Sequence, residues 1–599
     1  MGITGLPVGL HDFGKEGSLV ERYLSGMRHQ PWLQIVILLV FCSVIYFINL
    51  GRWDLWNPDE PRYAQVAREM VDGGDWVLMH ANGKTYEDKP PLFFWLIAFS
   101  SFLWQGFSSF SARFPSALLG TLTVLLTFFL GRKLYGSRTG FLSALILATS
   151  FEFAYLSTRA NVDATLTFLT TISLFFFWQW YHDRKAEGGE ERGERGLLIY
   201  GFYVGMALAT LTKGPVGLVL PLLVSLIYLA IQRDWKAMKR MRLLTGIALV
   251  FVIVLSWYIP AAWKGGQSFI EETLLFHTVN RFAKGSSHVR PFYYYFANFP
   301  VGFMPWFLFL PGAIVYRFLK KRERVPKESL FLLVWFVTIF LFFSFSKGKR
   351  TLYLLPLYPA VSLLVGKLWD DYLSGSGRRS PEKIWIVFPI YLFIIFFFLM
   401  GLFVYAIPAV ANLPVQSSTP RILKMVVHWA GLGVNYFSYV PPGSIAFFIF
   451  LLFGSSVLLS LAHGFKYKSI VFTLIVAAMG IGFFYVTRFI FPSVNPYKSG
   501  RFISKEITDR IKPGERLAMH GDFGSVGTAP YNFYTGIVPI LETESEGEVI
   551  DLFRSKERVF CLLRYEDYER LSRKDIGVSL RLITRRSVGN RDMALVSNH

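Results

Sequence analysis

Acidic, basic and tyrosine side chains gather in two short motifs in the first part of the chain. The first motif is Asn57-Pro58-Asp59-Glu60-Pro61-Arg62-Tyr63, and the second is Tyr86-Glu87-Asp88-Lys89-Pro90-Pro91. Carboxylates in such a cluster can accept a proton, and its cations can bind an anionic group. Because long apolar segments lie on both sides, the cluster indicates a chemical site at a membrane boundary.

The composition of the chain is that of a polytopic membrane protein. Of its 599 residues, 53% are hydrophobic, and the mean hydropathy is +0.40. About thirteen segments are long enough, or nearly so, to cross roughly 30 Å of hydrocarbon as helices. These segments are residues 32–50, 114–134, 139–157, 162–181, 197–213, 214–232, 242–263, 297–318, 328–346, 350–368, 384–407, 443–462 and 469–489.

The net charge of +21 does not indicate a nucleic-acid partner, because the basic residues follow a topological pattern. They recur in the loops after the second, fourth, sixth, eighth, tenth and twelfth predicted segments. The positive-inside rule places these loops and the N-terminus in the cytoplasm. The loops 51–113, 264–296 and 408–442 and the tail beyond residue 490 then face outward. Residues 1–30 are too polar for a cleavable signal, so the first segment is expected to remain as an anchor.

The first outward loop, residues 51–113, is expected to form a small folded unit. Asp59 can cap a helix that carries Pro61 in its first turn and ends at Gly73-Gly74. Asn82-Gly83 predicts a type I′ hairpin that delivers the second motif. The apolar stretch 92–104 is short for a span and is expected to lie in the membrane interface.

The tail has ordinary charge density and alternating strand-like and helical patterns. Strands are predicted at 516–520 and 558–563, with a helix at 545–554 between them. We therefore divide the chain into a membrane domain, residues 1–490, and a small soluble α/β domain outside the membrane, residues 491–599. The sequence contains no P-loop and no dinucleotide fingerprint, so the residues usual for nucleotide-driven transport or redox chemistry are missing.

Further polar residues lie at the predicted outer boundary of the membrane. If their loops converge, they form a cationic pocket with a few carboxylates, which suits a phosphorylated lipid better than a bare ion. Apart from the two motifs, these residues are Arg159, Asn161, Asp163, Lys213, His277, Arg281, His288, Arg290, Lys347, Lys349, Arg350 and Tyr353.

Simpler roles stay open for many of these groups. Asp163 could cap a helix or form an ion pair with Arg159, and the lysines could extend from the bilayer to the interface. Asp88 and His277 could hold a divalent metal, although two ligands without a characteristic spacing are weak evidence.

Several motifs together resemble the bacterial aminoarabinose transferase family, which modifies lipid A and is related to the protein O-mannosyltransferases. The first motif and the Asp88-Lys89-Pro90-Pro91-Leu92 stretch carry the resemblance most specifically. Ala112-Arg113-Phe114-Pro115, Leu211-Thr212-Lys213-Gly214-Pro215 and Ser346-Lys347-Gly348-Lys349 with Tyr353 extend it along the membrane domain.

The resemblance implies a GT-C glycosyltransferase that uses a sugar carried on a polyprenyl phosphate, typically undecaprenyl phosphate. It implies that Asp59 is the principal catalytic carboxylate, Asp163 a second acid and Lys89 a contact to the donor phosphate. It places Tyr63, Tyr86 and Tyr353 along the site and Arg281 at the donor phosphate. The chain has Asp88 where the family pattern has glutamate, and this departure weakens the case for a metal at that position.

The motifs and the resemblance together lead to the hypothesis of a direct displacement at the anomeric carbon, with polyprenyl phosphate as the leaving group. Arg62, Lys213, Lys347 and Lys349 are assigned to donor binding with Lys89, and the acceptor is lipid A, another envelope glycan or a protein. We expect a monomer in the bacterial inner membrane, with its active site outside the cytoplasm. The alternatives are a protein O-mannosyltransferase and a transporter or flippase for an anionic polyprenyl lipid.

Overall fold

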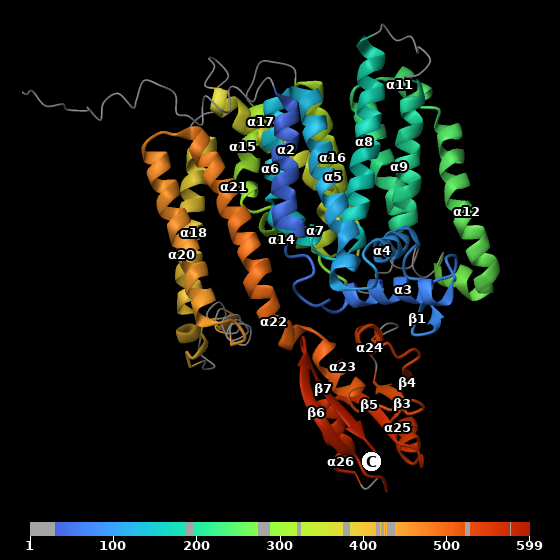
Figure 1. Ribbon diagram of the computed structural model, residues 1–599. Coiled ribbons are helices and arrows are strands. Elements are labelled where there is room, and N and C mark those ends of the chain that lie inside the picture. Colours follow the sequence, from blue (N-terminus) through green and yellow to red (C-terminus); the bar gives the residue numbers. More distant parts are fainter. Residues whose placement is uncertain are drawn as a thin grey trace, which may run out of the picture.

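The computed structural model describes residues 30–186, 196–273, 288–319, 325–374, 384–414, 438–521, 527–574 and 577–599, with isolated residues at 420, 424, 425 and 427. Figure 1 shows a bundle of roughly parallel helices, with a smaller sheet-containing unit beyond one end of it. The predicted helical membrane fold with a C-terminal α/β region is thereby confirmed.

In the described part of the chain, eight helices are long and apolar enough to cross a membrane. They are α5 (Ser109–Tyr135), α8 (Val162–Ala186), α12 (Leu243–Ile270), α16 (Lys327–Phe345), η8 with α17 (Thr351–Leu357 and Tyr358–Ser374), α18 (Ile384–Ala411), α20 (Pro442–Gly464) and α21 (Lys468–Tyr485). The last continues through the π-helix η10 (Val486–Ile490) into α22 (Phe491–Lys498).

Two further apolar segments are broken helices, and they raise the number of spans to ten if each pair crosses once. α6 (Ser137–Ala148) and α7 (Phe151–Ser157) meet at 71°. α14 (Tyr294–Gly302) meets the segment formed by η6 (Trp306–Phe309), α15 (Leu310–Ile314) and η7 (Val315–Leu319) at 109°. The two breaks lie against each other, because the Phe151 N–H donates to the Met304 carbonyl at 3.1 Å. The Trp306 indole likewise donates to Thr149 at 3.0 Å.

All thirteen predicted segments coincide with helices or broken helices. Three of them fall on apolar helices shorter than eighteen residues, which are α2 with η3 (Pro31–Cys42 and Ser43–Phe47), α9 (Leu198–Lys213) and α10 (Val216–Ile231). The short helix α11 (Trp235–Arg240) follows α10 and is capped by the Asp234 side chain.

The first loop lies across one end of the bundle (Figure 1). α3 (Asp59–Gly73) packs against α4 (Leu92–Leu103), with Val66, Ala67 and Met70 buried together with Phe93 and Ile97. Between them β1 (His80–Ala81) and β2 (Lys84–Thr85) form the predicted hairpin. The turn residues Asn82 and Gly83 have φ of 56° and 74°, as a type I′ turn requires.

The C-terminal region contains a five-stranded sheet in the order β4-β3-β5-β7-β6. β3 (Arg516–His520) is parallel to β4 (Leu541–Thr543) and β5 (Val559–Arg564), whereas β7 (Arg591–Ser597) is antiparallel to β5 and to β6 (Arg581–Val588). The helices are α23 (Arg501–Thr508), α24 (Ala529–Thr535), α25 (Glu546–Phe553) and α26 (Tyr565–Ser572). The alternating residues of β5 enter two apolar clusters, Phe560 and Leu562 on one face and Cys561 and Leu563 on the other.

Candidate active site

Asp59 is the first residue of α3 and is held by two guanidinium groups. One carboxylate oxygen accepts a hydrogen bond from Arg62 at 2.5 Å, and the other accepts one from Arg350 at 2.7 Å. Pro58 is the residue that precedes the helix, and no side chain caps it, so the predicted capping role of Asp59 is wrong. The carboxylate instead forms ion pairs with these two guanidinium groups.

The charge of Asp59 is stabilised despite its burial. Burial acts to raise the pKa of this carboxyl, but Arg62, Arg350 and Lys89 outweigh it and hold the pKa below its ordinary value. Asp59 is therefore ionised at neutral pH, with 18% of its side chain exposed. A partly open, ionised carboxylate can orient an acceptor or take a proton from it.

The second motif joins the first through Arg62. Asp88 lies 3.5 Å from the Arg62 guanidinium, and it accepts hydrogen bonds from Lys89 at 3.0 Å and from the Tyr86 hydroxyl at 3.4 Å. The rings of Tyr63 and Tyr86 are buried against Phe94 and form the wall behind these charges. The structure thus brings both motifs into one charged cluster.

Asp163, Lys213 and Tyr353 form a second group on other elements. The Lys213 ammonium at the end of α9 pairs with Asp163 at the start of α8, and it lies 4.1 Å from the centre of the Tyr353 ring. Asn161 caps α8, since its side-chain oxygen accepts from the N–H groups of Asp163 and Ala164 at 3.0 Å. Neither simpler role considered for Asp163, as a cap or as the partner of Arg159, occurs in the structure.

Electrostatics link the two groups at the Tyr63 hydroxyl. Burial raises the pKa of Tyr63 most strongly, and the charges of Asp59, Asp88 and Asp163 raise it further, while Arg62 opposes them. All three carboxylates therefore act on one buried hydroxyl. Asp59, Asp88 and Asp163, which come from three separate stretches of sequence, therefore lie within electrostatic range of Tyr63.

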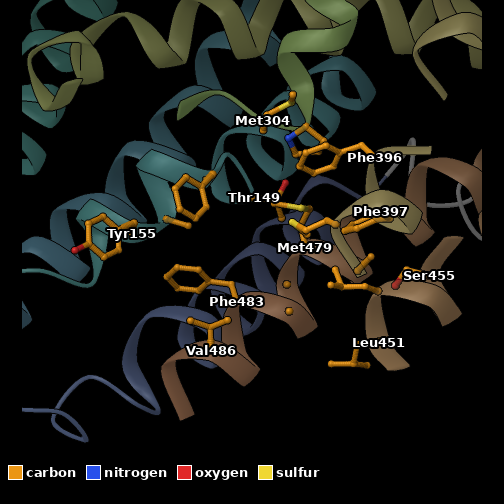
Figure 2. A pocket seen from close by; sticks show the side chains of 18 of the residues that line it. Thr149, Tyr155, Met304, Phe396, Phe397, Leu451, Ser455, Met479, Phe483 and Val486 are labelled. Carbon is orange, nitrogen blue, oxygen red and sulfur yellow. The ribbon is translucent and has the colours of Figure 1, made fainter. Parts of the chain in front are cut away.

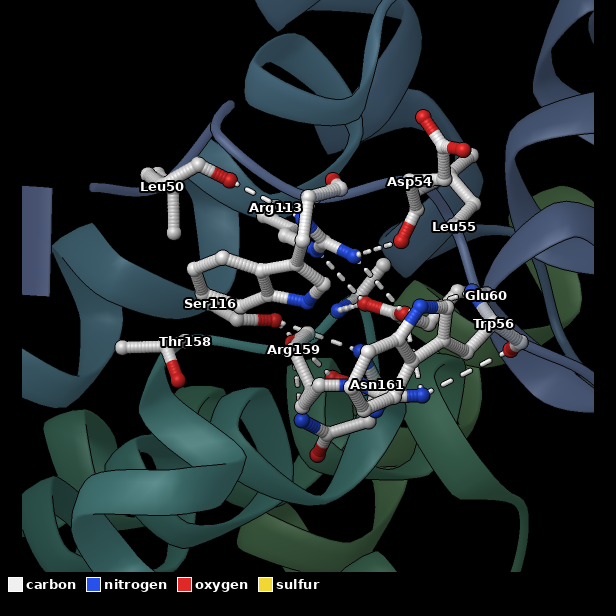
Figure 3. Close-up of polar contacts among 12 residues, drawn as sticks. Leu50, Asp54, Leu55, Trp56, Glu60, Arg113, Ser116, Thr158, Arg159 and Asn161 are labelled. Carbon is white, nitrogen blue, oxygen red and sulfur yellow. Dashed lines mark hydrogen bonds and ion pairs between the residues drawn. The ribbon is translucent and has the colours of Figure 1, made fainter. Parts of the chain in front are cut away.

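Beside Asp59, Glu60 forms a buried ion network that the sequence analysis did not assign (Figure 3). Glu60 is 1% exposed and accepts two hydrogen bonds from Arg113, at 2.7 and 2.9 Å. Arg159 lies 2.9 Å from the same carboxylate, and the N–H groups of Trp56 and Ala160 complete its partners at 3.0 Å. Glu60 and Arg113 both occur in the motifs that carry the family resemblance, but the sequence does not show that they pair with each other.

Arg350 is a contact that the sequence motifs do not single out, because they assign its neighbours Lys347 and Lys349 to the donor. Arg350 contacts Asp59 directly, whereas Lys349 is buried and its ammonium donates to the carbonyls of Ser346 and Arg290. Lys349 therefore holds the loop together and does not face the carboxylate cluster. Lys347 is exposed. Arg281 and His277 lie outside the described residues.

The metal site predicted at Asp88 and His277 stays a prediction, because His277 lies outside the described residues. Within the described ranges, no group of three or more His, Cys, Asp or Glu side chains could hold a metal ion. Asp88 is instead surrounded by Arg62, Lys89 and Tyr86, all of which are hydrogen-bond donors or cations. Such donors compete with a cation for the carboxylate oxygens.

The hairpin of the first loop is fastened to the C-terminal domain. The Asn82 side chain accepts from Asn532 at 2.9 Å and from the Ile540 N–H at 2.7 Å. It also donates to the Ile540 carbonyl at 2.9 Å and to Glu542 at 3.0 Å. On the loop side, the Asn82 and Gly83 N–H groups donate to Glu69 of α3 at 2.8 and 2.9 Å.

Comparisons with known proteins place this chain in a family. Residues 32–276 match the family model of dolichyl-phosphate-mannose-protein mannosyltransferases. The undecaprenyl phosphate-alpha-4-amino-4-deoxy-L-arabinose arabinosyl transferase of Pectobacterium atrosepticum is 33% identical over 59% of this chain and 61% of that protein. The enzyme with the same description from Pseudomonas aeruginosa strain UCBPP-PA14 is 32% identical over 69% of this chain and 72% of that protein. This chain belongs to the aminoarabinose transferase family.

The fold of this aminoarabinose transferase family member is also that of a solved relative. The crystal structure of ArnT from Cupriavidus metallidurans bound to undecaprenyl phosphate superimposes with a TM-score of 0.75 at 21% identity. The match covers 95% of this chain and 98% of that one. The family and the GT-C fold predicted from the motifs are confirmed. The alignment with the Pectobacterium enzyme spans about three fifths of that relative's length, 61%.

Proposed function

We propose that this protein transfers a sugar from a polyprenyl phosphate donor to lipid A at the outer face of the bacterial inner membrane. The observation that carries the proposal is the ionised Asp59, bound by Arg62 and Arg350 and placed beside the Asp88–Lys89 pair. The relatives named above suggest that the donor is undecaprenyl phosphate carrying 4-amino-4-deoxy-L-arabinose and that this sugar is transferred.

The chemistry is a displacement at the anomeric carbon of the sugar. An acceptor oxygen forms the new bond, the bond from the anomeric carbon to the phosphate oxygen breaks, and the electron pair leaves with polyprenyl phosphate. Lys89 and Lys213 are 12% and 11% exposed, and each holds a carboxylate that an incoming phosphate could replace as a partner. Cations held in such a partly dry site stabilise a leaving phosphate better than cations in water.

The role of Asp59 depends on the acceptor group. A hydroxyl acceptor gives its proton to Asp59, which then acts as general base with an effect of about 10²–10⁴-fold. A lipid A phosphate is already ionised, so Asp59 then orients the sugar and its amino group without taking a proton. In both cases Arg62 and Arg350 fix the carboxylate in one position.

The test uses purified protein in lipid vesicles with the aminoarabinose donor and lipid A, and it measures the product by mass spectrometry. We expect Asp59→Asn to lower transfer by at least about 10²-fold while undecaprenyl phosphate binding is retained. Asp72→Asn, on the exposed face of the same helix, serves as the matched control and should keep full activity.

The same assay separates the alternatives. A transporter or flippase moves the donor lipid, but the wild-type protein then attaches no sugar to any acceptor. A protein O-mannosyltransferase leaves lipid A unchanged and adds hexose to secreted proteins. Either result would refute the proposal.

A further inference from the structure

Glu152 is a buried acid inside one of the broken membrane helices, and the proposed reaction does not use it. It is the second residue of α7 and is 8% exposed. Its carboxyl group accepts a hydrogen bond from the Tyr358 hydroxyl at 2.8 Å, and the Thr351 side chain is its second hydrogen-bonding partner. Among the described residues, no basic side chain pairs with it. Acidic side chains inside membrane segments are rare and usually serve a function.

Three elements meet at this carboxyl group. Tyr358 begins α17, and Gly302 of α14 lies against the bond, since a Cβ at Gly302 would come within 2.4 Å of both the Glu152 carboxyl and the Tyr358 hydroxyl. The breaks of the two membrane segments meet nearby, at one wall of an apolar cavity of about 540 Å³ that Thr149 and Met304 line (Figure 2). Glu152 is not part of that lining. Its carboxyl group is therefore bound to protein groups and is not open to the cavity.

The Glu152 carboxyl group is bonded to the residue that follows Arg350, one of the two arginines that hold Asp59. Arg350 directly precedes η8, of which Thr351 is the first residue, and its backbone is extended with φ −133° and ψ 145°. The Arg350 guanidinium donates to Asp59 at 2.7 Å. Its carbonyl accepts from the hydroxyl of Tyr295 on α14 at 3.1 Å. Both broken segments thus hold the backbone from which the Arg350 side chain extends.

We propose that Glu152 is a positioning residue, which accepts hydrogen bonds from the two ends of η8 and so holds Arg350 where its guanidinium reaches Asp59. The inference rests on the proposed function, because it assumes that the transfer uses the charge of Asp59. The cations that act on Asp59 are Arg62, Arg350 and Lys89. Arg62 and Lys89 belong to the first loop, as Asp59 does. Arg350 is the one of these three that the membrane helices must bring to the site.

The first test compares Glu152→Leu with Glu152→Gln. Leucine leaves the two hydroxyl groups without their acceptor, whereas glutamine keeps an acceptor oxygen. We expect Glu152→Leu to move the acidic limb of the kcat/KM profile to higher pH by about one unit, because a weakened Arg350–Asp59 pair raises the pKa of Asp59. Glu152→Gln should keep the wild-type profile. Equal shifts in the two variants would show that the carboxyl group acts through its charge and would overturn the positioning role.

Tyr203→Phe is the matched control for the loss of a buried hydrogen bond. The buried Tyr203 hydroxyl donates to the Met241 carbonyl at 2.8 Å, and Met241 follows α11, at the end of the bundle away from α3 (Figure 1). This variant should keep the wild-type profile even if its unfolding temperature falls. Glu152→Leu combined with Arg350→Gln should shift the limb no further than Arg350→Gln alone, because Glu152 acts through Arg350. Additive shifts would contradict the inference.

The second test does not depend on turnover. Hydrogen exchange of the full chain in detergent should be faster in residues 349–353 of Glu152→Leu than in the wild type, and unchanged in α9 and α10. If the wild-type protein transfers no sugar, or Arg350→Gln leaves the acidic limb in place, the proposed function fails, and hydrogen exchange still tests whether Glu152 holds Arg350. If exchange in residues 349–353 is unchanged, or Arg350→Gln shifts the limb and Glu152→Leu does not, the positioning role of Glu152 is refuted.

Discussion

Two neighbouring carboxylates, Asp59 and Glu60, have opposite environments. Glu60 is enclosed by Arg113, Arg159 and two backbone N–H groups, and 1% of it is exposed. The Asp59 side chain is 18% exposed and has only guanidinium groups as hydrogen-bond donors among the described residues. One carboxylate therefore holds the loop on the bundle, and the other remains available to a substrate.

Glu60→Gln should destabilise the protein strongly. The amide keeps the shape of the side chain but leaves Arg113 and Arg159 without their negative partner in a buried site. Breaking a buried ion pair from one side costs about 3–5 kcal/mol, so the temperature of unfolding in detergent should fall clearly. Asp72→Asn, on the same helix and exposed, should leave it unchanged; equal stabilities of the two variants would argue against a structural role for the network.

Arg350→Gln should shift the pH dependence of activity. Burial acts to raise the pKa of Asp59, but the positive charges of Arg62, Arg350 and Lys89 outweigh it and keep the pKa low. Removing Arg350 therefore raises that pKa. The acidic limb of the kcat/KM profile should move to higher pH, while activity at alkaline pH changes least. The ion pairs of Asp59 also add stability above its unfolded pKa of about 3.9, and that contribution is lost as the pH falls through the folded pKa.

Arg501→Gln is the matched control for this experiment. Arg501 pairs with Asp54 at 3.2 Å and makes no described contact with Asp59. Its profile should follow that of the wild type. An acidic limb that stays in place in Arg350→Gln would show that Asp59 does not control it.

Local motifs were sufficient to predict the candidate reacting groups but not their partners. Asp59 and Arg62 are three residues apart on one helix, so their pairing follows from sequence spacing. Arg350 is 291 residues away from Asp59, and no spacing rule connects them. The pairs Arg159–Glu60 and Lys213–Asp163 also join residues far apart in the sequence, so spacing alone does not predict them.

Among the elements, the hairpin β1–β2 connects the first loop to the C-terminal region. Asn82 uses its amide oxygen and both amide hydrogens in this connection and is 5% exposed. Glu69 ties the same turn to α3, the helix that begins with Asp59. The C-terminal region contacts the loop through this turn and also at Leu55, Arg68 and Asp54, whose partners are Tyr534, Phe533 and Arg501.

Asn82→Ala should loosen this connection. The change leaves the Ile540 N–H and the Asn532 amide without their acceptor, at about 1–3 kcal/mol for a buried unsatisfied group. We expect faster hydrogen exchange in residues 537–543 and a lower kcat, with little change in the membrane helices. Lys84→Ala removes only the exposed pair with Glu542 and should behave like the wild type; unchanged exchange in Asn82→Ala would contradict the coupling.

Hydrophobic runs were sufficient to find the apolar helices but not their breaks. All thirteen predicted segments fall on helices or broken helices, because apolar length is a property of the local sequence, but only eight to ten of those described are long and apolar enough to cross a membrane. The breaks at residues 149–150 and 303–305 depend on contacts between helices far apart in the chain, which hydropathy does not contain.

At the scale of the whole molecule, the first loop and the C-terminal sheet lie at the same end of the bundle (Figure 1). This arrangement agrees with the single outward face proposed from the basic loops. The opposite end carries a dense ion network in which Asp370 pairs with Arg138 and Lys367, and Asp371 with Lys367 and Arg317.

Cysteine labelling in intact cells tests this orientation. The native Cys42 and Cys561 are free but buried, so a single cysteine introduced at Lys84 or Arg240 can be followed separately. A membrane-impermeant maleimide should label Lys84→Cys in spheroplasts and Arg240→Cys only after lysis. Labelling of Arg240→Cys in intact spheroplasts would reverse the proposed topology.

The meeting of the two broken helices has a consequence for biogenesis. Thr149 and Phe151 find their partners at Trp306 and Met304, which the ribosome adds about 150 residues later. Until then, the Phe151 N–H lacks this partner, and an unsatisfied backbone group within the membrane costs several kcal/mol. The broken helix of α6 and α7 is therefore complete only after the later broken helix has been inserted.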